Sequence, residues 1–217
     1  MLTLAAVIVV TTAPWAHVHI RQSVDIPMRD APYTLAADVY LPAETGQWPA
    51  ILIQTPYNKE RHADGFTDDL PDGDPLLESS DYAFVVVDWR GFFGSRDAAY
   101  TGSPTGAEDG YDCVAWIAAQ PWCTGAVGTW GSSALGNIQM RTAAERPPSL
   151  RGCMPRVYHF REWYDQWFPG GVYGKSRGDF VDLYFLGGTG LYKNRPVYTA
   201  FWSFIETNSG DVADIDV

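Results

Sequence analysis

The sequence is poor in cysteine, histidine and basic residues, and it holds no long hydrophobic run. Its 217 residues include three Cys and four His, and 15 basic against 26 acidic residues give a net charge of −11. The odd, low cysteine count does not support a disulfide framework, and the cysteine spacing fits no zinc pattern. The scarcity of basic residues argues against nucleic acid as a partner, because phosphate binding needs clustered Lys and Arg.

The longest apolar run near the start of the sequence, residues 1–10, is too short to span a bilayer. No other stretch has a transmembrane pattern, so we expect no membrane association. The run is similar to a signal-peptide core, but no Lys or Arg precedes it, and Pro14 disrupts the small-residue pattern of a cleavage site. We therefore interpret residues 1–16 as a signal-like or ill-defined N-terminus and favour a cytoplasmic over a secreted location.

Apolar and aromatic residues, in contrast, are plentiful. Hydrophobic residues make up 46% of the chain and aromatic residues 14%, including nine Trp, whereas charged residues make up 19%. This composition predicts a folded chain with a sizeable core. The length suits one domain, or one domain with an appendage, and the aromatic content suits a large core or a lined cleft.

Strand and helix patterns alternate along residues 17–157. Alternating polarity or short apolar runs predict strands at residues 17–26, 33–41, 50–53, 82–88, 126–130 and 150–157. Helical periodicity predicts helices at residues 105–118 and 133–145, the first with capping-box spacing between Thr105 and Glu108. Strands separated by helices predict an α/β fold with a parallel sheet.

The pattern changes after Tyr158, where aromatic residues crowd into a helical periodicity. Short helices are predicted at residues 180–192 and 198–207. We interpret residues 17–157 as the N-terminal part of an α/β domain. Residues 158–210 would form a helical cap inserted over its sheet. Residues 211–217 then begin the next core strand.

A Gly-x-Ser motif stands between the predicted strand at 126–130 and the following helix, in the run Gly131-Ser132-Ser133-Ala134-Leu135-Gly136. A nucleophile elbow needs this context, because its Ser occupies a tight, strained turn at the end of a strand. The second Gly, however, comes one residue later than in the usual pattern. From the motif alone, a nucleophile elbow at Ser133 and an ordinary Gly/Ser turn both stay open.

Several separated motifs, in order, closely resemble one serine hydrolase family, which contains X-prolyl dipeptidyl-peptidases, bacterial cocaine esterase and α-amino acid ester hydrolases. The motifs are Met28-Arg29-Asp30, residues 35–42, Thr55-Pro56-Tyr57, Asp88-Trp89-Arg90-Gly91, residues 108–112 and residues 116–133. The resemblance covers about residues 18–217.

The resemblance implies an α/β-hydrolase fold whose helical cap follows the strand after the nucleophile helix. It implies that Ser133 is the acyl-forming nucleophile and that the backbone N–H of Ala134 and the hydroxyl of Tyr57 donate to the oxyanion. A phenol suits that role, because it donates a hydrogen bond and carries no charge near neutral pH. Without the resemblance, Tyr57 would be read as an aromatic residue at a strand end.

Two features of the resemblance bear on the substrate pocket. Family members often carry Tyr directly after the nucleophile, whereas this chain has Ala134. This difference changes the pocket shape but leaves the backbone donor. In the cap, Trp163, Trp167 and Phe168 would shape the acyl pocket, although helical spacing makes core packing the default for such residues.

A serine nucleophile needs a base, which in α/β-hydrolases is a His that follows an Asp or Glu along the chain. After Ser133 the chain has one His, His159, at the start of the cap, where the order does not suit the base. We therefore expect the triad Asp, the triad His and the C-terminal part of the sheet to be missing from this chain, as in a truncated hydrolase.

These observations lead to one main functional hypothesis. The chain is a serine hydrolase that cleaves an ester or amide, in a small molecule or short peptide, through an acyl-enzyme, and it is inactive as it stands. The alternative is a non-catalytic binding module on a hydrolase scaffold. We expect no cofactor and no metal, since the acidic loop at residues 68–78 lacks EF-hand spacing and is interrupted by prolines.

Overall fold

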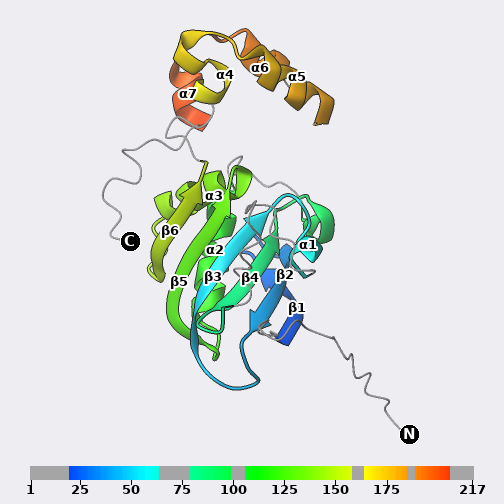
Figure 1. Ribbon diagram of the computed structural model, residues 1–217, viewed down its shortest axis with the longest axis vertical. Coiled ribbons are helices and arrows are strands. Elements are labelled where there is room, and N and C mark those ends of the chain that lie inside the picture. The colour runs from blue at the N-terminus through cyan, green and yellow to red at the C-terminus, as the bar shows by residue number, and fades with distance from the viewer. Residues whose placement is uncertain (1–19, 64–78, 99–105, 158–163, 185–188, 206–217) are drawn as a thin grey trace, which may run out of the picture.

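The structure is a computed structural model that describes residues 20–63, 79–98, 106–157, 164–184 and 189–205. In these residues six strands form one mixed sheet in the spatial order β1-β2-β4-β3-β5-β6 (Figure 1). The strands are β1 (Ile20–Pro27), β2 (Thr34–Leu41), β3 (Trp48–Thr55), β4 (Ala83–Asp88), β5 (Cys123–Ser132) and β6 (Leu150–Arg156). All six predicted strands are confirmed, although β3 and β5 are longer than expected.

The strand directions divide the sheet into two parts. β1 pairs antiparallel with β2 along its whole length, from Ile20 opposite Leu41 to Pro27 opposite Thr34, and β2 pairs antiparallel with β4. The pairs β4–β3, β3–β5 and β5–β6 are parallel, as the strand–helix alternation predicted. β3, β4, β5 and β6 therefore end at the same side of the sheet, which we call the carboxyl edge.

The sheet is buried on both faces at its centre. All six residues of β4 are buried, and alternate residues of a strand point to opposite faces. Val85 and Val87 belong to the larger apolar cluster, whereas Phe84 and Val86 belong to a second cluster. This two-sided burial explains the continuous apolar run of the strand.

The helices α2 (Ala107–Ala118) and α3 (Ala134–Ala144) pack against each other, and both lie behind the strands in Figure 1. Their contact is close at Gly110, where an added Cβ would lie 1.9 Å from the Thr142 Oγ1 atom. The capping box predicted at Thr105 is wrong. The N-cap is Gly106, with φ 67° and no side-chain cap, because glycine enters the left-handed region without steric cost.

The remaining helices belong to the loop after β3 and to the cap. They are α1 (Glu60–Ala63), α4 (Tyr164–Trp167), the 3-10 helix η3 (Pro169–Gly171), α5 (Lys175–Tyr184), α6 (Thr189–Lys193) and α7 (Ala200–Ile205); a further 3-10 helix, η2 (Phe93–Ser95), follows β4. The helix predicted at 180–192 falls on α5 and α6, while residues 185–188 lie outside the described residues. The predicted helix at 198–207 is present as the shorter α7.

The cap helices α4 to α7 lie beyond the carboxyl edge of the sheet (Figure 1). They have their own aromatic core, in which Trp167, Phe168 and Trp202 are buried. The Trp167 ring stacks on Tyr192 at 4.9 Å between centroids, and Tyr164 meets Trp202 edge-on at 5.4 Å. The predicted helical cap is thus present, but its expected limits at 158 and 210 lie outside the described residues.

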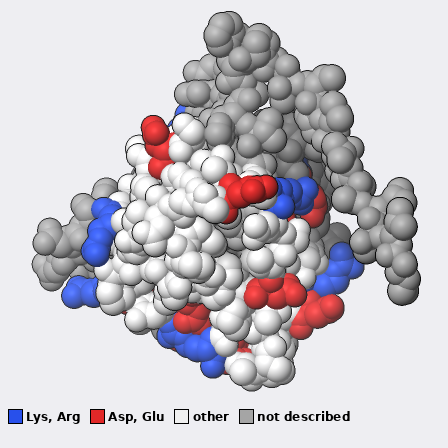
Figure 2. All heavy atoms as spheres, turned by 90° about the horizontal axis from the view of Figure 1, so that it is seen from below, with Lys and Arg blue, Asp and Glu red and all other residues white. Residues whose placement is uncertain are grey.

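Charges are scattered over the described surface. On the side viewed from below in Figure 2, acidic and basic side chains lie among uncharged residues without gathering into one large patch of either sign. Among the helices that the structure describes, none is long and apolar enough to cross a membrane.

Candidate active site

The motif around Ser133 forms a sharp turn between β5 and α3. Ser133 is the N-cap of α3 and has φ 54° and ψ −118°, a conformation that a residue with a side chain rarely adopts. Its N–H donates to the Arg156 carbonyl at 3.0 Å, and its own carbonyl accepts from the N–H groups of Gly136 and Asn137 at 3.0 and 2.9 Å. These bonds hold the strained turn, and the Ser133 side chain is exposed at the carboxyl edge.

Two glycines make this turn sterically feasible. Gly131 has φ 143°, and a Cβ there would lie 2.4 Å from the Leu135 Cβ. At Gly136 a Cβ would lie 2.6 Å from the Arg156 carbonyl oxygen of β6. Because the second glycine is needed where α3 crosses β6, its position three residues after Ser133 is consistent with an elbow geometry.

The N-terminus of α3 lies directly behind Ser133. As the first residue of the helix, Ala134 has an N–H group for which the helix itself contains no acceptor. The helix dipole places partial positive charge at the same point. The turn therefore combines a serine hydroxyl with a backbone donor suited to a developing negative charge.

Tyr57 follows the neighbouring strand at the same edge. β3 and β5 are in parallel register, with Leu52 beside Thr129, and three residues further along these strands are Thr55 and Ser132. Tyr57 and Ser133 thus follow the ends of adjacent strands. The Tyr57 N–H donates to the Thr55 Oγ1 atom at 3.0 Å, and 37% of the residue's surface is exposed.

Backbone strain gathers at this edge of the sheet. Five described residues other than glycine have positive φ, and four of them follow the ends of β3, β4, β5 and β6: Asn58, Phe93, Ser133 and Val157. Such conformations cost free energy and persist where the surrounding structure enforces them, as is common at functional sites. The strain marks the carboxyl edge as the candidate site independently of the Gly-x-Ser motif.

A buried glutamine that the sequence analysis missed braces the elbow. Gln139 of α3 is 1% exposed. Its Nε2 donates to the carbonyls of Gly131 and Leu135 at 3.0 and 2.9 Å, and its Oε1 accepts from the Thr129 hydroxyl at 3.1 Å. It lies six residues after Ser133 and joins both sides of the turn, whereas its place on a helix gave no sequence indication of burial.

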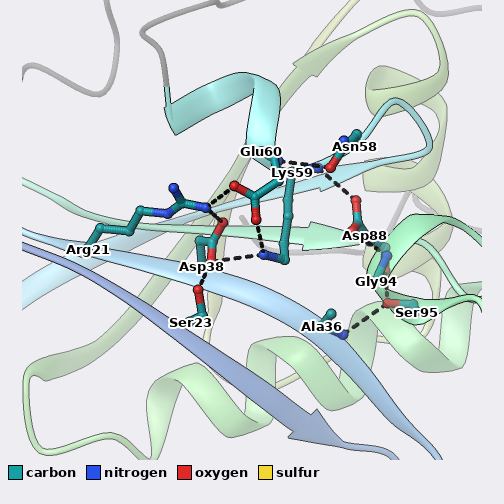
Figure 3. Close-up of polar contacts among 10 residues, drawn as sticks. All are labelled: Arg21, Ser23, Ala36, Asp38, Asn58, Lys59, Glu60, Asp88, Gly94 and Ser95. Carbon is teal, nitrogen blue, oxygen red and sulfur yellow. Dashed lines mark hydrogen bonds and ion pairs between the residues drawn. The ribbon is translucent and has the colours of Figure 1, made fainter.

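A cluster of charged residues at the loop after β3 includes the buried Asp38 and Lys59 and the exposed Glu60 (Figure 3). The Lys59 ammonium donates to Asp38 Oδ1 and Glu60 Oε1, both at 3.0 Å. Asp38 is fully buried and also accepts from Ser23 at 2.6 Å and from Arg21 at 2.7 Å. Arg21 bonds Glu60 as well. The cluster thus joins β1, β2 and the start of α1.

The ionisation of this cluster is set by burial and by hydrogen bonds. Burial by itself raises the pKa of Asp38, but the donors Ser23, Arg21 and Lys59 outweigh it and hold that pKa below the usual 3.8. Burial likewise lowers the pKa of Lys59, while its bonds to Asp38 and Glu60 raise it above the usual 10.5. Both groups are therefore charged at neutral pH.

Asp88 extends the cluster to the loop after β4. Its Oδ1 accepts the Lys59 N–H at 2.7 Å, and its Oδ2 accepts the Gly94 N–H at 3.0 Å. Its backbone carbonyl accepts from the Ser95 hydroxyl at 2.8 Å. Burial raises the pKa of Asp88 more than the backbone donors lower it.

A second set of ion pairs unites motifs that lie far apart in the sequence. Arg90, 8% exposed, binds Asp109 at 2.6 and 2.9 Å and Asp30 at 2.9 and 3.0 Å. Arg29 pairs with Asp112 at 2.8 Å. These contacts link the β1–β2 turn, the loop after β4 and α2.

The other predicted site residues fall into two groups. Trp167 and Phe168 are each 2% exposed in the aromatic core of the cap, which favours the packing interpretation, and a role in the acyl pocket stays a prediction. Trp163, His159 and the acidic loop at 68–78 lie outside the described residues. Among the residues that the structure does describe, no cluster of three or more His, Cys, Asp or Glu is arranged to hold a metal.

Comparisons with known proteins agree with this architecture. A cocaine esterase of Rhodococcus sp. (strain MB1 Bresler) is 30% identical over 183 residues, which cover 81% of this chain and 30% of that protein. A CocE/NonD family hydrolase of Staphylococcus aureus superposes with a TM-score of 0.70 at 21% identity, over 89% of this chain and 39% of its own. An α-amino acid ester hydrolase superposes with a TM-score of 0.62 at 25% identity, over 80% and 31% of the two chains.

The chain therefore has the α/β-hydrolase fold and spans about a third of the length of these relatives. The chain matches the model of the X-Pro dipeptidyl-peptidase family over residues 31–203, which include β2 to β6, the turn at Ser133 and most of the cap. On this match, the chain belongs to the X-Pro dipeptidyl-peptidase family, S15.

Proposed function

We propose that this chain carries the nucleophile and the oxyanion donors of a serine hydrolase that cleaves an ester or amide bond. The observation that carries the proposal is the strained, exposed Ser133 at the junction of β5 and α3, with the N-terminal donors of the helix behind it. The family membership and the esterase and ester-hydrolase relatives support the reaction class. Small esters, amides or short peptides are the proposed substrates.

The proposed chemistry proceeds through an acyl-enzyme. The Ser133 hydroxyl attacks the carbonyl carbon, its proton passes to a general base, and the leaving group departs with a proton as the tetrahedral intermediate collapses. The Ala134 N–H and the Tyr57 hydroxyl donate to the oxyanion while it carries charge. Water then hydrolyses the acyl-Ser133 ester and releases the acid.

Covalent labelling with a fluorophosphonate, read by peptide mass spectrometry, tests the proposal. We expect the label on Ser133 and its loss in Ser133→Ala. The matched control is Ser132→Ala, since Ser132 is the preceding residue but is 8% exposed and ends β5. Because the reaction needs a general base, added imidazole should accelerate the labelling. A label that stays in Ser133→Ala would contradict the proposal and favour the binding-module alternative.

A further inference from the structure

The exposed position of Tyr57 raises the question of what fixes its hydroxyl. The residue is 37% exposed, so packing encloses only part of it. Its backbone, however, is bound on both sides. The Tyr57 N–H donates to Thr55 Oγ1 at 3.0 Å, and two residues later the Lys59 N–H donates to Asp88 Oδ1 at 2.7 Å. The residue between them, Asn58, has φ 83°.

The side chain of Lys59 adds a second attachment for the same loop. Lys59 is 7% exposed, and its ammonium lies between the carboxylates of Asp38 and Glu60, as Figure 3 shows. Asp38 belongs to β2 and is fully buried, so the contact ties the loop after β3 to a rigid strand. Lys59 thus holds the segment 57–60 through both its backbone and its side chain.

Asp88 connects this loop to the next one along the carboxyl edge. The same carboxylate that accepts the Lys59 N–H accepts the Gly94 N–H, and the Ser95 hydroxyl joins the Asp88 carbonyl to the Ala36 N–H at 2.8 and 2.9 Å. The loops after β3 and β4 are therefore held in a fixed relation to each other and to β2.

Stability alone does not account for such a cluster. A buried ion pair gains Coulomb energy but loses hydration, and replacement by apolar residues of similar volume is often neutral or stabilising. Charged hydrogen bonds do, however, define one geometry more sharply than apolar contacts. A sharply defined geometry matters for a loop that places a catalytic hydroxyl, because a misplacement of about 1 Å can lower the rate about 100-fold.

We propose that Lys59 is a positioning residue. Its ammonium, bound by Asp38 and Glu60, and its N–H, bound by Asp88, set the loop that presents the Tyr57 hydroxyl to the oxyanion. This inference rests on the proposed role of Tyr57 in hydrolysis. It assigns a task to a charged cluster that makes no contact with substrate in the proposed chemistry.

The test compares Lys59→Met with Lys59→Arg in protein labelled with 3-fluorotyrosine. The fluorine resonance missing from Tyr57→Phe identifies Tyr57, and its shift reports the position of the ring without any substrate. Arg29→Met is the matched control, because it removes a surface cation and its ion pair with Asp112 far from this loop in sequence. Hydrolysis of a p-nitrophenyl ester is measured on the same proteins.

We expect Lys59→Met to shift the Tyr57 resonance. In Lys59→Arg the resonance should stay near its position in the unsubstituted protein, because the cation is kept. Where the ester is hydrolysed, Lys59→Met should lower kcat by about 10- to 100-fold with little change in KM, and Tyr57→Phe in that background should cost little more. Arg29→Met should change neither readout.

An unmoved Tyr57 resonance in Lys59→Met would overturn the proposal even if the protein became less stable. Should Lys59→Met not fold, Asp88→Asn provides the same test, because the amide keeps the shape of the side chain but accepts one of the two N–H groups instead of both. If a fluorophosphonate does not label Ser133, the proposed function fails, while the fluorine resonance still decides whether Lys59 positions Tyr57.

Discussion

Gly136→Ala should destabilise the protein, although the same change in most helices is stabilising. Gly136 lies in the first turn of α3, and alanine there would gain up to about 1 kcal/mol of helix propensity over glycine. The new Cβ, however, would lie 2.6 Å from the Arg156 carbonyl oxygen, closer than such atoms approach. The obstacle is backbone of a paired strand, so it does not rotate away as a side chain would.

The magnitude follows from the balance of these effects. Inserting a methyl group into a filled contact costs about 1–3 kcal/mol. Moving α3 away from β6 also strains the bond from the Ser133 N–H to the Arg156 carbonyl, which contributes about 0.5–1.5 kcal/mol. After the helix gain is subtracted, the free energy of unfolding should fall by about 1–3 kcal/mol.

Urea denaturation followed by tryptophan fluorescence measures this change. Gly152→Ala is the control, because Gly152 lies in β6 as Arg156 does, but an added Cβ would meet nothing within 4 Å. It should leave the free energy unchanged or raise it by up to about 1 kcal/mol. If Gly136→Ala proved as stable as the unsubstituted protein, α3 would not approach β6 as closely as described, and the account of the elbow would fail.

Three further predictions concern buried polar groups. Gln139→Leu leaves the buried Thr129 hydroxyl without its acceptor and should cost about 1–3 kcal/mol in the same denaturation assay; no loss would refute the bracing role. Burial raises the pKa of Cys113 well above the usual 9.0, so this thiol should react with Ellman's reagent in urea but hardly at all in the folded protein. Asp38 has a lowered pKa, so its stabilising effect is present above the usual 3.8 and is lost as the pH falls. Asp38→Asn should therefore be less stable than the unsubstituted protein at neutral pH, with a difference that shrinks under acid; a constant difference would contradict the ionised state.

The architecture was largely predictable because local patterns encode burial on a sheet or helix face. The apolar run of β4 and the alternation along β1 and β2 each indicated a strand, and the strand–helix order indicated parallel pairing. The entry to α2 was not predictable in the same way. Thr105 and Glu108 have the spacing of a capping box, yet Gly106 takes the left-handed conformation that begins the helix.

The site was predictable where the chemistry is local in sequence. Gly131, Ser133 and Gly136 lie within six residues, so a strand–turn–helix context is enough to suggest the turn that the structure shows. Gln139 was missed because a polar residue on a helix is more often exposed, and its burial depends on how α3 packs on β5. Lys59 was missed because it precedes an acidic loop that gave every indication of being solvated.

The charged cluster shows why local sequence patterns do not predict sites of this kind. Asp38 occupies a position in β2 whose alternation points it away from the apolar face of Ala37 and Val39, which in a simple strand means solvent. The loop after β3 covers it with Lys59 instead, 21 residues away, and Asp88 completes the arrangement from 29 residues beyond. None of the three positions has a local sequence pattern that indicates a site. Moving the charged groups of Asp38, Lys59 and Asp88 out of water does not by itself stabilise the sheet. Their convergence beneath the one loop that carries Tyr57 therefore argues for accurate placement of that loop, because burial of apolar side chains at the same three positions would have satisfied folding alone.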